Sequence, residues 1–213
     1  MPQVVTLGDI NVDIIASIPR YPAPGGDGLA EWAEVHSGGS AANTATVLAR
    51  FGVEVGIIGR VGRDALAEQA LARLSEAGVD LSCVQRDDEA ITGIMFIPVT
   101  PDGGRTLFGY RGANFRLDPA LLDEGYIAQA DVFHLSGYAL LAEPQRSAVR
   151  RAKELSTRPI LMGSGTAAEN IADFLQYADG AIVGSSLKVD GVAENPVDVE
   201  RVKRYMEAVR TVR

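Results

Sequence analysis

The stretch VVTLGDINVD, residues 4–13, places a short apolar run directly before a glycine and an acidic residue. A run of this length, ended by a turn signal, is typical of a buried strand. The polar residues Asn11 and Asp13 follow just past its carboxyl end, and in open parallel sheets ligands bind at that edge. The stretch therefore predicts a central strand at Val4–Leu7 with a ligand site beside it.

The stretch SGGSAAN, residues 37–43, supplies a second candidate part of that site. Its glycines, Gly38 and Gly39, allow a ligand to approach the backbone, and they lead into a helix expected at residues 41–51. The amide of Asn43 both donates and accepts hydrogen bonds. One carboxylate and two amides suit a polyhydroxylated ligand. The residues alone leave a second interpretation open, in which Asp13 and Asn43 only cap turns.

Beyond these motifs the chain alternates strands with helices, which predicts parallel βαβ units and hence an α/β fold with a Rossmann-like parallel sheet. Segment 29–35 alternates apolar and polar residues, and segments 91–99 and 105–110 flank the turn at 101–104, so we expect them to form a small separate antiparallel sheet. Further strands are expected at 53–58, 132–135, 159–162 and 181–183, and further helices at 64–77, 118–122, 144–155, 167–177 and 198–212.

The chain divides into two parts near Thr157. Residues 1–157 carry the extra hairpins, whereas residues 158–213 alternate strictly as two βα units. A parallel strand at 159–162 would cover the sheet edge left by the first part, and exposed edges are unfavourable. We therefore expect the two C-terminal βα units to continue one sheet.

Composition excludes several classes of protein. The 213 residues are 46% hydrophobic, enough for a globular core, and the net charge of −8 argues against a nucleic-acid binder. No segment approaches the ~20 apolar residues of a membrane span, and the first residues have no basic segment typical of a secretory signal. The single cysteine, Cys83, fits a reducing cytoplasm, and with only two histidines we expect no metal site made by protein ligands.

Several motifs in order give the chain a family resemblance. GGSAANTA at residues 38–45, Gly52 and GRVGRD at 59–64 resemble the N-terminal signature of the ribokinase-like (PfkB) carbohydrate kinases. The stretch at 8–13, the hairpin at 91–110 with the following RGAN, and HLSG at 134–137 extend the similarity from about residue 3 to about 155.

The resemblance implies a ribokinase-type sheet with a small β lid, and ATP-dependent phosphorylation of a sugar hydroxyl with ATP and Mg²⁺ as cofactors. It also implies a homodimer formed through the lid. Ser40 and Gly137 stand where ribose-specific members carry a lysine and an acid, which argues against ribose itself. Carried over by position, the substrate-binding residues would be Asn11, Asp13, Gly38, Gly39, Asn43, Arg111 and Asn114.

The same resemblance identifies motifs that the sequence does not contain. The family's Gly-Ala-Gly-Asp segment, which supplies an anion hole and the catalytic base, does not occur, and no Asn-x-x-Glu follows residue 155. We therefore assign no catalytic residue and expect a sugar-binding chain that is inactive alone or chimeric. Two alternatives remain open: a non-enzymatic sugar or sugar-phosphate binder, or a structural α/β chimera without a ligand.

Residues 158–213 resemble the last two βα units of BtpA-family (β/α)₈ barrels, through RPILMGSG at 158–165 and ADGAIVGSSLK at 178–188. Each expected strand ends in a Gly/Ser loop whose amides suit a phosphate. Ordinary βα turns are the alternative, and GSGTAA at 163–168 also fits a loose dinucleotide pattern without its confirming acid. The candidate phosphate-binding residues are Gly163, Ser164, Gly165, Gly184 and Ser185.

Overall fold

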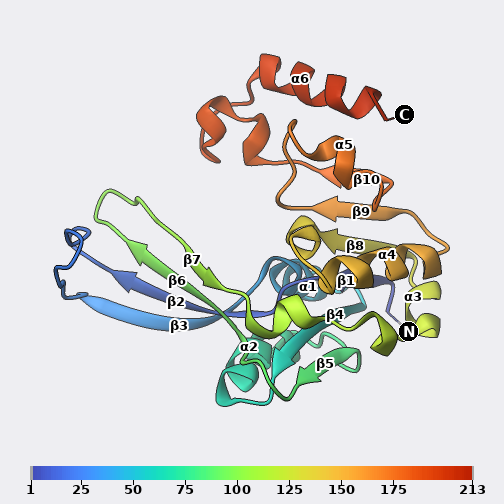
Figure 1. Cartoon of the computed structure of the whole chain (residues 1–213), viewed down its shortest axis with the longest axis horizontal. Helices are drawn as coiled ribbons and strands as arrows, with labels where there is room; N and C mark the ends of the chain where they lie inside the picture. The colour runs from blue at the N-terminus through green and yellow to red at the C-terminus, as the bar shows by residue number, and fades with distance from the viewer. Residues whose placement is uncertain (1, 213) are drawn as a thin grey trace.

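The computed structural model describes residues 2–212, which form a six-stranded parallel sheet in the order β10-β9-β8-β1-β4-β5 (Figure 1). The central strand β1 carries the buried side chains Val5 and Leu7, as its apolar run predicts. Parallel strands need cover on both faces, which is why these runs are apolar throughout. The strands are β1 (Val4–Leu7), β4 (Val55–Gly62), β5 (Val84–Asp87), β8 (Val132–Ser136), β9 (Ile160–Gly163) and β10 (Gly180–Ile182).

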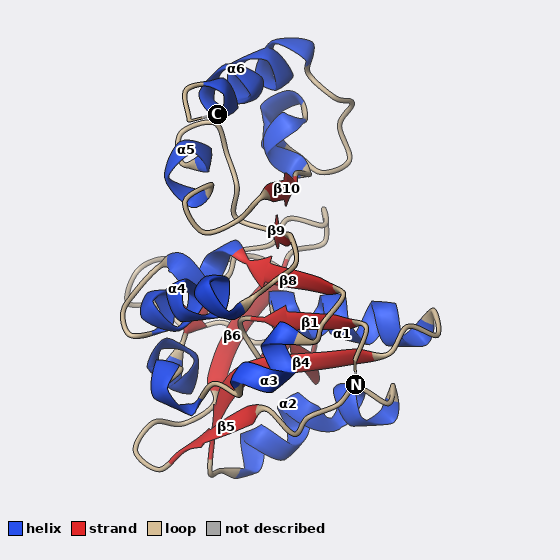
Figure 2. Cartoon of the chain, turned by 90° about the vertical axis from the view of Figure 1, so that its right-hand side faces the viewer, coloured by secondary structure: helices blue, strands red, loops and turns tan. Residues whose placement is uncertain are grey.

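Helices cover the two faces of this sheet and bury two apolar clusters. One cluster packs α1 and α2 against the sheet, and the other packs α3 and α4 against the opposite face (Figure 2). The side chain of Asp64 accepts a hydrogen bond from the Ala67 N–H and so caps α2, as its place before an apolar run predicts. The helices are α1 (Ser40–Arg50), α2 (Ala65–Glu76), α3 (Glu124–Ala128), α4 (Gln145–Leu155), α5 (Ile171–Phe174) and α6 (Val199–Arg210).

A second sheet of four strands, in the order β3-β2-β6-β7, projects from one side of the first and is called the lid (Figure 1). Its strands are β2 (Asn11–Ser17), β3 (Trp32–Gly38), β6 (Gly93–Val99) and β7 (Phe108–Tyr110). The hairpin β6–β7 is antiparallel as expected, but β2 pairs with β6 in parallel, so the lid is a mixed sheet. Strand β2 was not predicted, because its polar start is typical of a ligand-binding loop.

The C-terminal units continue the main sheet. Strand β9 pairs in parallel with β8, and β10 pairs with β9, which confirms the prediction of one sheet. The helix expected at 167–177 is wrong in length, because α5 has only four residues. The Asn170 side chain accepts from the Ala167 N–H and donates to the Gly165 carbonyl, and this holds the preceding residues in turns.

Short 3₁₀ helices connect these elements. Three of them carry residues of the candidate site: η1 carries Asn114, η3 places Tyr138 after β8, and η4 begins at Ser185. No helix within residues 2–212 is both long and apolar enough to cross a membrane. The 3₁₀ helices are η1 (Gly112–Arg116), η2 (Pro119–Leu121), η3 (Gly137–Leu140), η4 (Ser185–Leu187) and η5 (Val189–Gly191).

Candidate functional site

A cavity of about 170 Å³, called the lid pocket, lies where the lid meets the first turn of α1. Its polar wall comes from the start of β2, the start of α1 and the segment before η1, and its apolar wall comes from the lid hairpin. The lining residues are Asp9, Asn11, Asp13, Gly39, Ser40, Asn43, Met95, Ile97, Leu107, Arg111 and Tyr138.

Asp13 presents an unpaired carboxylate to this pocket. It lies on β2 directly across from His36 on β3 and Met95 on β6, and its Oδ1 is buried without a hydrogen-bond partner in the described part of the chain. Burial raises the pKa of Asp13, and the nearby His36 offsets part of that rise. Gly38 packs against this carboxylate so closely that a Cβ there would collide with it. The carboxylate is therefore positioned to accept hydrogen bonds from a ligand.

The start of α1 forms a second wall of the lid pocket. Gly39 has φ 103°, and a Cβ at that position would meet the carbonyl oxygen of Asp9, so the turn requires glycine. This turn brings Ser40 and the exposed Asn43 to the cavity. A hydroxyl and an amide there provide both donors and acceptors at a helix N-terminus.

Arg111 forms the cationic corner of the lid pocket. Its guanidinium pairs with Asp9, whose side chain is 1% exposed, and lies 5.1 Å from the ring centroid of Tyr138. The Gln145 amide also donates to Asp9 Oδ1 at 3.3 Å. Because Asp9 is engaged on both sides, Asp13 is the lining carboxylate left free for a ligand.

Asn114 lies behind the pocket, where it is fully buried, and it holds the side chain of Asn11 in place. Its Oδ1 accepts from the Ile10 N–H at 2.9 Å, and its Nδ2 donates to Asn11 Oδ1 at 2.8 Å. These bonds leave the Asn114 amide no group for a ligand, whereas Asn11 lines the cavity. The structure therefore places Asn114 as a positioning residue.

A larger cavity of about 420 Å³ adjoins the lid pocket, and the two share Tyr138. The Ser40 hydroxyl donates to Ser164 Oγ at 2.9 Å across the boundary between them. Burial lowers the pKa of His134 at this cavity, so its imidazole is neutral near pH 7, and its Nδ1 has no partner within residues 2–212. The lining residues are Thr44, His134, Tyr138, Gly163, Ser164, Gly165, Thr166, Ile182, Gly184, Ser185 and Ser186.

The structure thus divides the candidates into two groups. Asn11, Asp13, Gly39, Asn43 and Arg111 line the lid pocket, with Gly38 and Asn114 directly behind it. The five candidate phosphate-binding residues line the larger cavity together.

Sequence reasoning missed Asp9, Tyr138 and the apolar wall. Asp9 lies inside the quoted stretch 4–13, but nothing local reveals its pairing with Arg111. The sequence signal available for this wall is the hairpin predicted at 91–110, because residues two apart on a strand, such as Met95 and Ile97, share one face.

The larger cavity does not fit a divalent cation by its donor set. No carboxylate lines the larger cavity, and among residues 2–212 no group of three or more His, Cys, Asp or Glu could hold a metal ion. Magnesium in phosphate chemistry is usually held by one or two carboxylates together with phosphate oxygens. The Mg²⁺ expected from the resemblance therefore has no supporting residues at this cavity.

Comparisons with known proteins agree on one family. The model of the "pfkB family carbohydrate kinase" matches residues 1–183, which includes β9 and β10. The ATP-dependent ribose-1-phosphate kinase of Halopiger xanaduensis is 35% identical over 136 residues, covering 64% of this chain and 46% of that protein. Fructokinase-1 of Oryza sativa subsp. japonica is 36% identical over 157 residues, covering 72% and 47%. The chain thus spans about half the length of these curated relatives.

Solved structures show the same fold. Arabidopsis thaliana ribokinase complexed with ribose and ATP superposes with a TM-score of 0.78 at 20% identity, over 99% of this chain and 69% of that one. The fructokinase of Halothermothrix orenii gives a TM-score of 0.75 at 26% identity, over 97% and 76%.

Proposed function

Because its residues 1–183 match the family model, this chain belongs to the pfkB family of carbohydrate kinases, and we propose that its lid pocket binds a sugar or a related polyol. The observation that carries this proposal is the partly buried carboxylate of Asp13, whose Oδ1 lies among donors and acceptors and has no hydrogen-bond partner within residues 2–212. A buried unpaired carboxylate is costly, and a ligand hydroxyl that donates to it removes that cost.

Each wall of the lid pocket suits one part of such a ligand. Asp13 accepts hydrogen bonds from hydroxyls, while Asn11 and Asn43 both donate and accept. Met95, Ile97 and Leu107 offer an apolar surface for the carbon-bound face of a sugar ring. The pocket of about 170 Å³ has room for one small polyol.

We propose that these 213 residues bind the sugar but do not transfer phosphate by themselves. A transferring enzyme needs a base at the attacking hydroxyl and donors around the moving phosphoryl group. The sequence contains no Gly-Ala-Gly-Asp segment, and the lining carboxylate Asp9 is held by Arg111. ATP and Mg²⁺ would then require groups outside these residues.

Calorimetric titration with a panel of free sugars and sugar alcohols tests the binding proposal. We expect a saturable heat from at least one of them, abolished by Asp13→Ala and retained by Glu34→Ala, which removes an exposed lid carboxylate. No heat from any panel member would favour a structural protein without a ligand. ATP-coupled turnover that depends on both sugar and Asp13 would overturn the proposed inactivity.

A second candidate function is the binding of a sugar phosphate. The Gly163–Gly165 turn and the Gly184–Ser185 turn line one cavity next to the lid pocket, and the Ser40–Ser164 hydrogen bond joins the two walls. A ligand with its sugar at Asp13 and its phosphate at these turns would span both. Tighter binding of a phosphorylated sugar than of the free sugar, lost in Ser185→Ala, would support this function.

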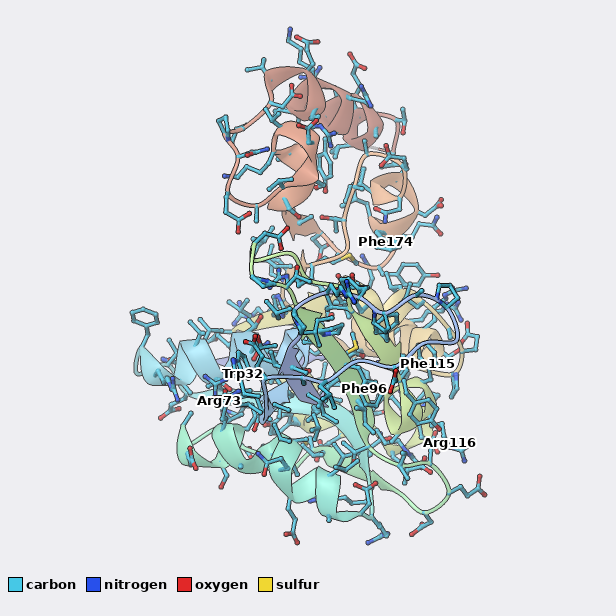
Figure 3. The ribbon with its side chains drawn as sticks, turned by 90° about the vertical axis from the view of Figure 1, so that its left-hand side faces the viewer. Trp32, Arg73, Phe96, Phe115, Arg116 and Phe174 are labelled. Carbon is cyan, nitrogen blue, oxygen red and sulfur yellow. The ribbon has the colours of Figure 1, made fainter. Side chains whose placement is uncertain are left out.

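We also propose that the chain forms a homodimer through its lid. The lid face opposite the pocket carries Val35, Phe96 and Phe108, each about half exposed, with Ile14 between Val35 and Phe96. Phe96 is labelled in Figure 3. Apolar patches of this kind on a projecting sheet mark interaction surfaces. An isologous pair would cover this patch in both copies.

A further inference from the structure

A third cavity, of about 80 Å³, lies between the turn that follows β9 and the helix α6. Four of its seven lining residues come from beyond residue 183, where the family match ends. We call it the α6 pocket. Its lining residues are Ala167, Ala168, Glu169, Ser186, Arg201, Arg204 and Tyr205.

The capped start of α6 directs two cations to this pocket. The Asp198 carboxylate accepts from the N–H groups of Glu200 and Arg201, which fixes where the helix begins. Arg201, Arg204 and Tyr205 are then spaced i, i+3 and i+4, so they share one helix face. That face is the one that closes the pocket.

One hydroxyl group at this pocket, that of Ser186, has no hydrogen-bond partner within the described part of the chain. The Tyr205 side chain is 5% exposed, and its hydroxyl lies beside the Thr166 side chain. Burial raises the pKa of Tyr205, and the hydrogen bond with Thr166 offsets part of that rise. Buried hydroxyls in native proteins are almost always paired, which indicates that something else supplies the acceptor.

The charges at the pocket favour an anion as that acceptor. Arg204 makes no ion pair in the part of the chain that the structure describes, and Arg201 has only a 3.7 Å contact with Asp198. Glu169 is the one carboxylate among the lining residues, so two guanidinium groups face a single negative charge. Guanidinium groups recognise phosphate oxygens through paired hydrogen bonds.

We propose that the α6 pocket is a phosphate-binding site, in which Arg201 and Arg204 pair with the anion and the Ser186 and Tyr205 hydroxyls donate to it. About 80 Å³ is well below the 300 Å³ or more typical of a pocket for a whole organic ligand, and it suits a single phosphoryl group. Ser186 also lines the 420 Å³ cavity, so the organic part of a phosphate ester has space to extend there. This site does not depend on sugar binding at the lid pocket.

The test is titration of the full chain with inorganic phosphate, followed by calorimetry and ³¹P NMR. Saturable binding is expected, with an affinity at least tenfold lower in Arg204→Ala and in Arg201→Ala. Lys203→Ala is the matched control, because Lys203 lies on the exposed side of the same helix and pairs with Glu200, so it should leave the affinity unchanged. Equal affinity in Arg204→Ala and Lys203→Ala, or no saturable binding by the wild type, would overturn the proposal.

Two further variants separate a phosphate site from a structural ion cluster. Glu169→Gln removes the opposing charge and should tighten phosphate binding, whereas a structural cluster would only lose stability in thermal unfolding. Tyr205→Phe keeps the buried ring and should weaken phosphate binding severalfold at a temperature where the variant is fully folded. If affinity for phosphate drops in Ser185→Ala but not in Arg204→Ala, the phosphate binds in the larger cavity, and this assignment is overturned.

The source of the phosphate is distinguished by competing ligands. Ribose 5-phosphate that binds more tightly than inorganic phosphate, and still depends on Arg204, would identify a phosphate ester whose organic part lies in the larger cavity. Equal affinities would identify free phosphate. ATP serves as the third arm, and its binding should show the same loss in Arg204→Ala if its terminal phosphate uses this pocket.

Discussion

Arg111 and Asp9 form an ion pair at the back of the lid pocket, between residues that are far apart in sequence and both largely buried. Arg111→Met keeps much of the side-chain length but leaves Asp9 with only the Gln145 amide. We expect a loss of about 3–5 kcal/mol in the free energy of unfolding, because a buried carboxylate without its partner is strongly destabilising. Urea unfolding measures this loss.

The double variant Asp9→Asn/Arg111→Met serves as the control for this prediction. It removes both charges, so it should recover a large part of the stability lost by Arg111→Met alone. Losses that simply add would show that the two side chains are not energetically coupled.

The Asp13 carboxylate should lower the stability of the unliganded protein and raise its affinity for sugar. Asp13→Asn relieves an unpaired, partly buried carboxylate, so we expect a higher unfolding temperature without ligand. The same change should weaken binding of the preferred sugar by about 10–100-fold, because a hydrogen bond to a charged acceptor contributes about 1.5–3 kcal/mol. Thermal unfolding and calorimetry on the same samples would measure both effects, and a variant that loses both stability and affinity would contradict this account.

The pH dependence of sugar binding should follow the raised pKa of Asp13. The ionised carboxylate accepts hydroxyl hydrogen bonds more strongly than the protonated acid does, so affinity falls as pH drops through that pKa, which lies above the ordinary 3.8. The stability of the unliganded protein should change with pH in the opposite direction. Burial disfavours the ionised form of Asp13 in the folded state. The stability contributed by protonated Asp13 is therefore present below pH 3.8 and is lost as pH rises through the pKa of the folded state. Both trends should vanish in Asp13→Asn.

The fold was largely predictable because local signals and long-range packing agree. The apolar run at Val4–Leu7 and the Asp64 cap of α2 appear as expected, and β9 joins β8. Strand β2 was missed because it pairs with β6 across many intervening residues, and no local pattern reveals a parallel partner. The origin of residues 158–213 in a BtpA-type barrel stays a prediction.

The site was predictable only in part. Motif spacing identified Asn11, Asp13 and Asn43, which the chain order brings to one sheet edge. The different roles of Asn11 and Asn114 could not be predicted, because they depend on which amide the backbone of Ile10 engages. The α6 pocket was not predicted either, since Arg201 and Arg204 meet the residues after β9 only once α6 packs beside that turn.

Asp87 should make the protein sensitive to acid. Burial alone would raise its pKa, but the N–H groups of Ala90 and Glu89, together with Arg116 and Arg60, hold that pKa well below its ordinary value. The resulting stability is present above pH 3.8 and is lost as pH falls toward the lowered pKa. Asp87→Asn should cost about 3–5 kcal/mol at pH 7 and flatten this acid dependence, as measured by urea unfolding from pH 7 to about pH 2. Asp88→Asn, which changes an exposed neighbour, is the matched control and should change little.

The last prediction concerns the lid. If two copies pair through the lid face that carries Val35, Phe96 and Phe108, light scattering should give twice the 22.6 kDa mass of one chain. Phe96→Glu places a charge in the centre of that face and should shift the protein to monomer. Phe51→Glu is the control, because Phe51 is 83% exposed at the end of α1, away from the lid. A monomer at all concentrations in the wild type would contradict the dimer, and an unchanged dimer in Phe96→Glu would place its interface elsewhere.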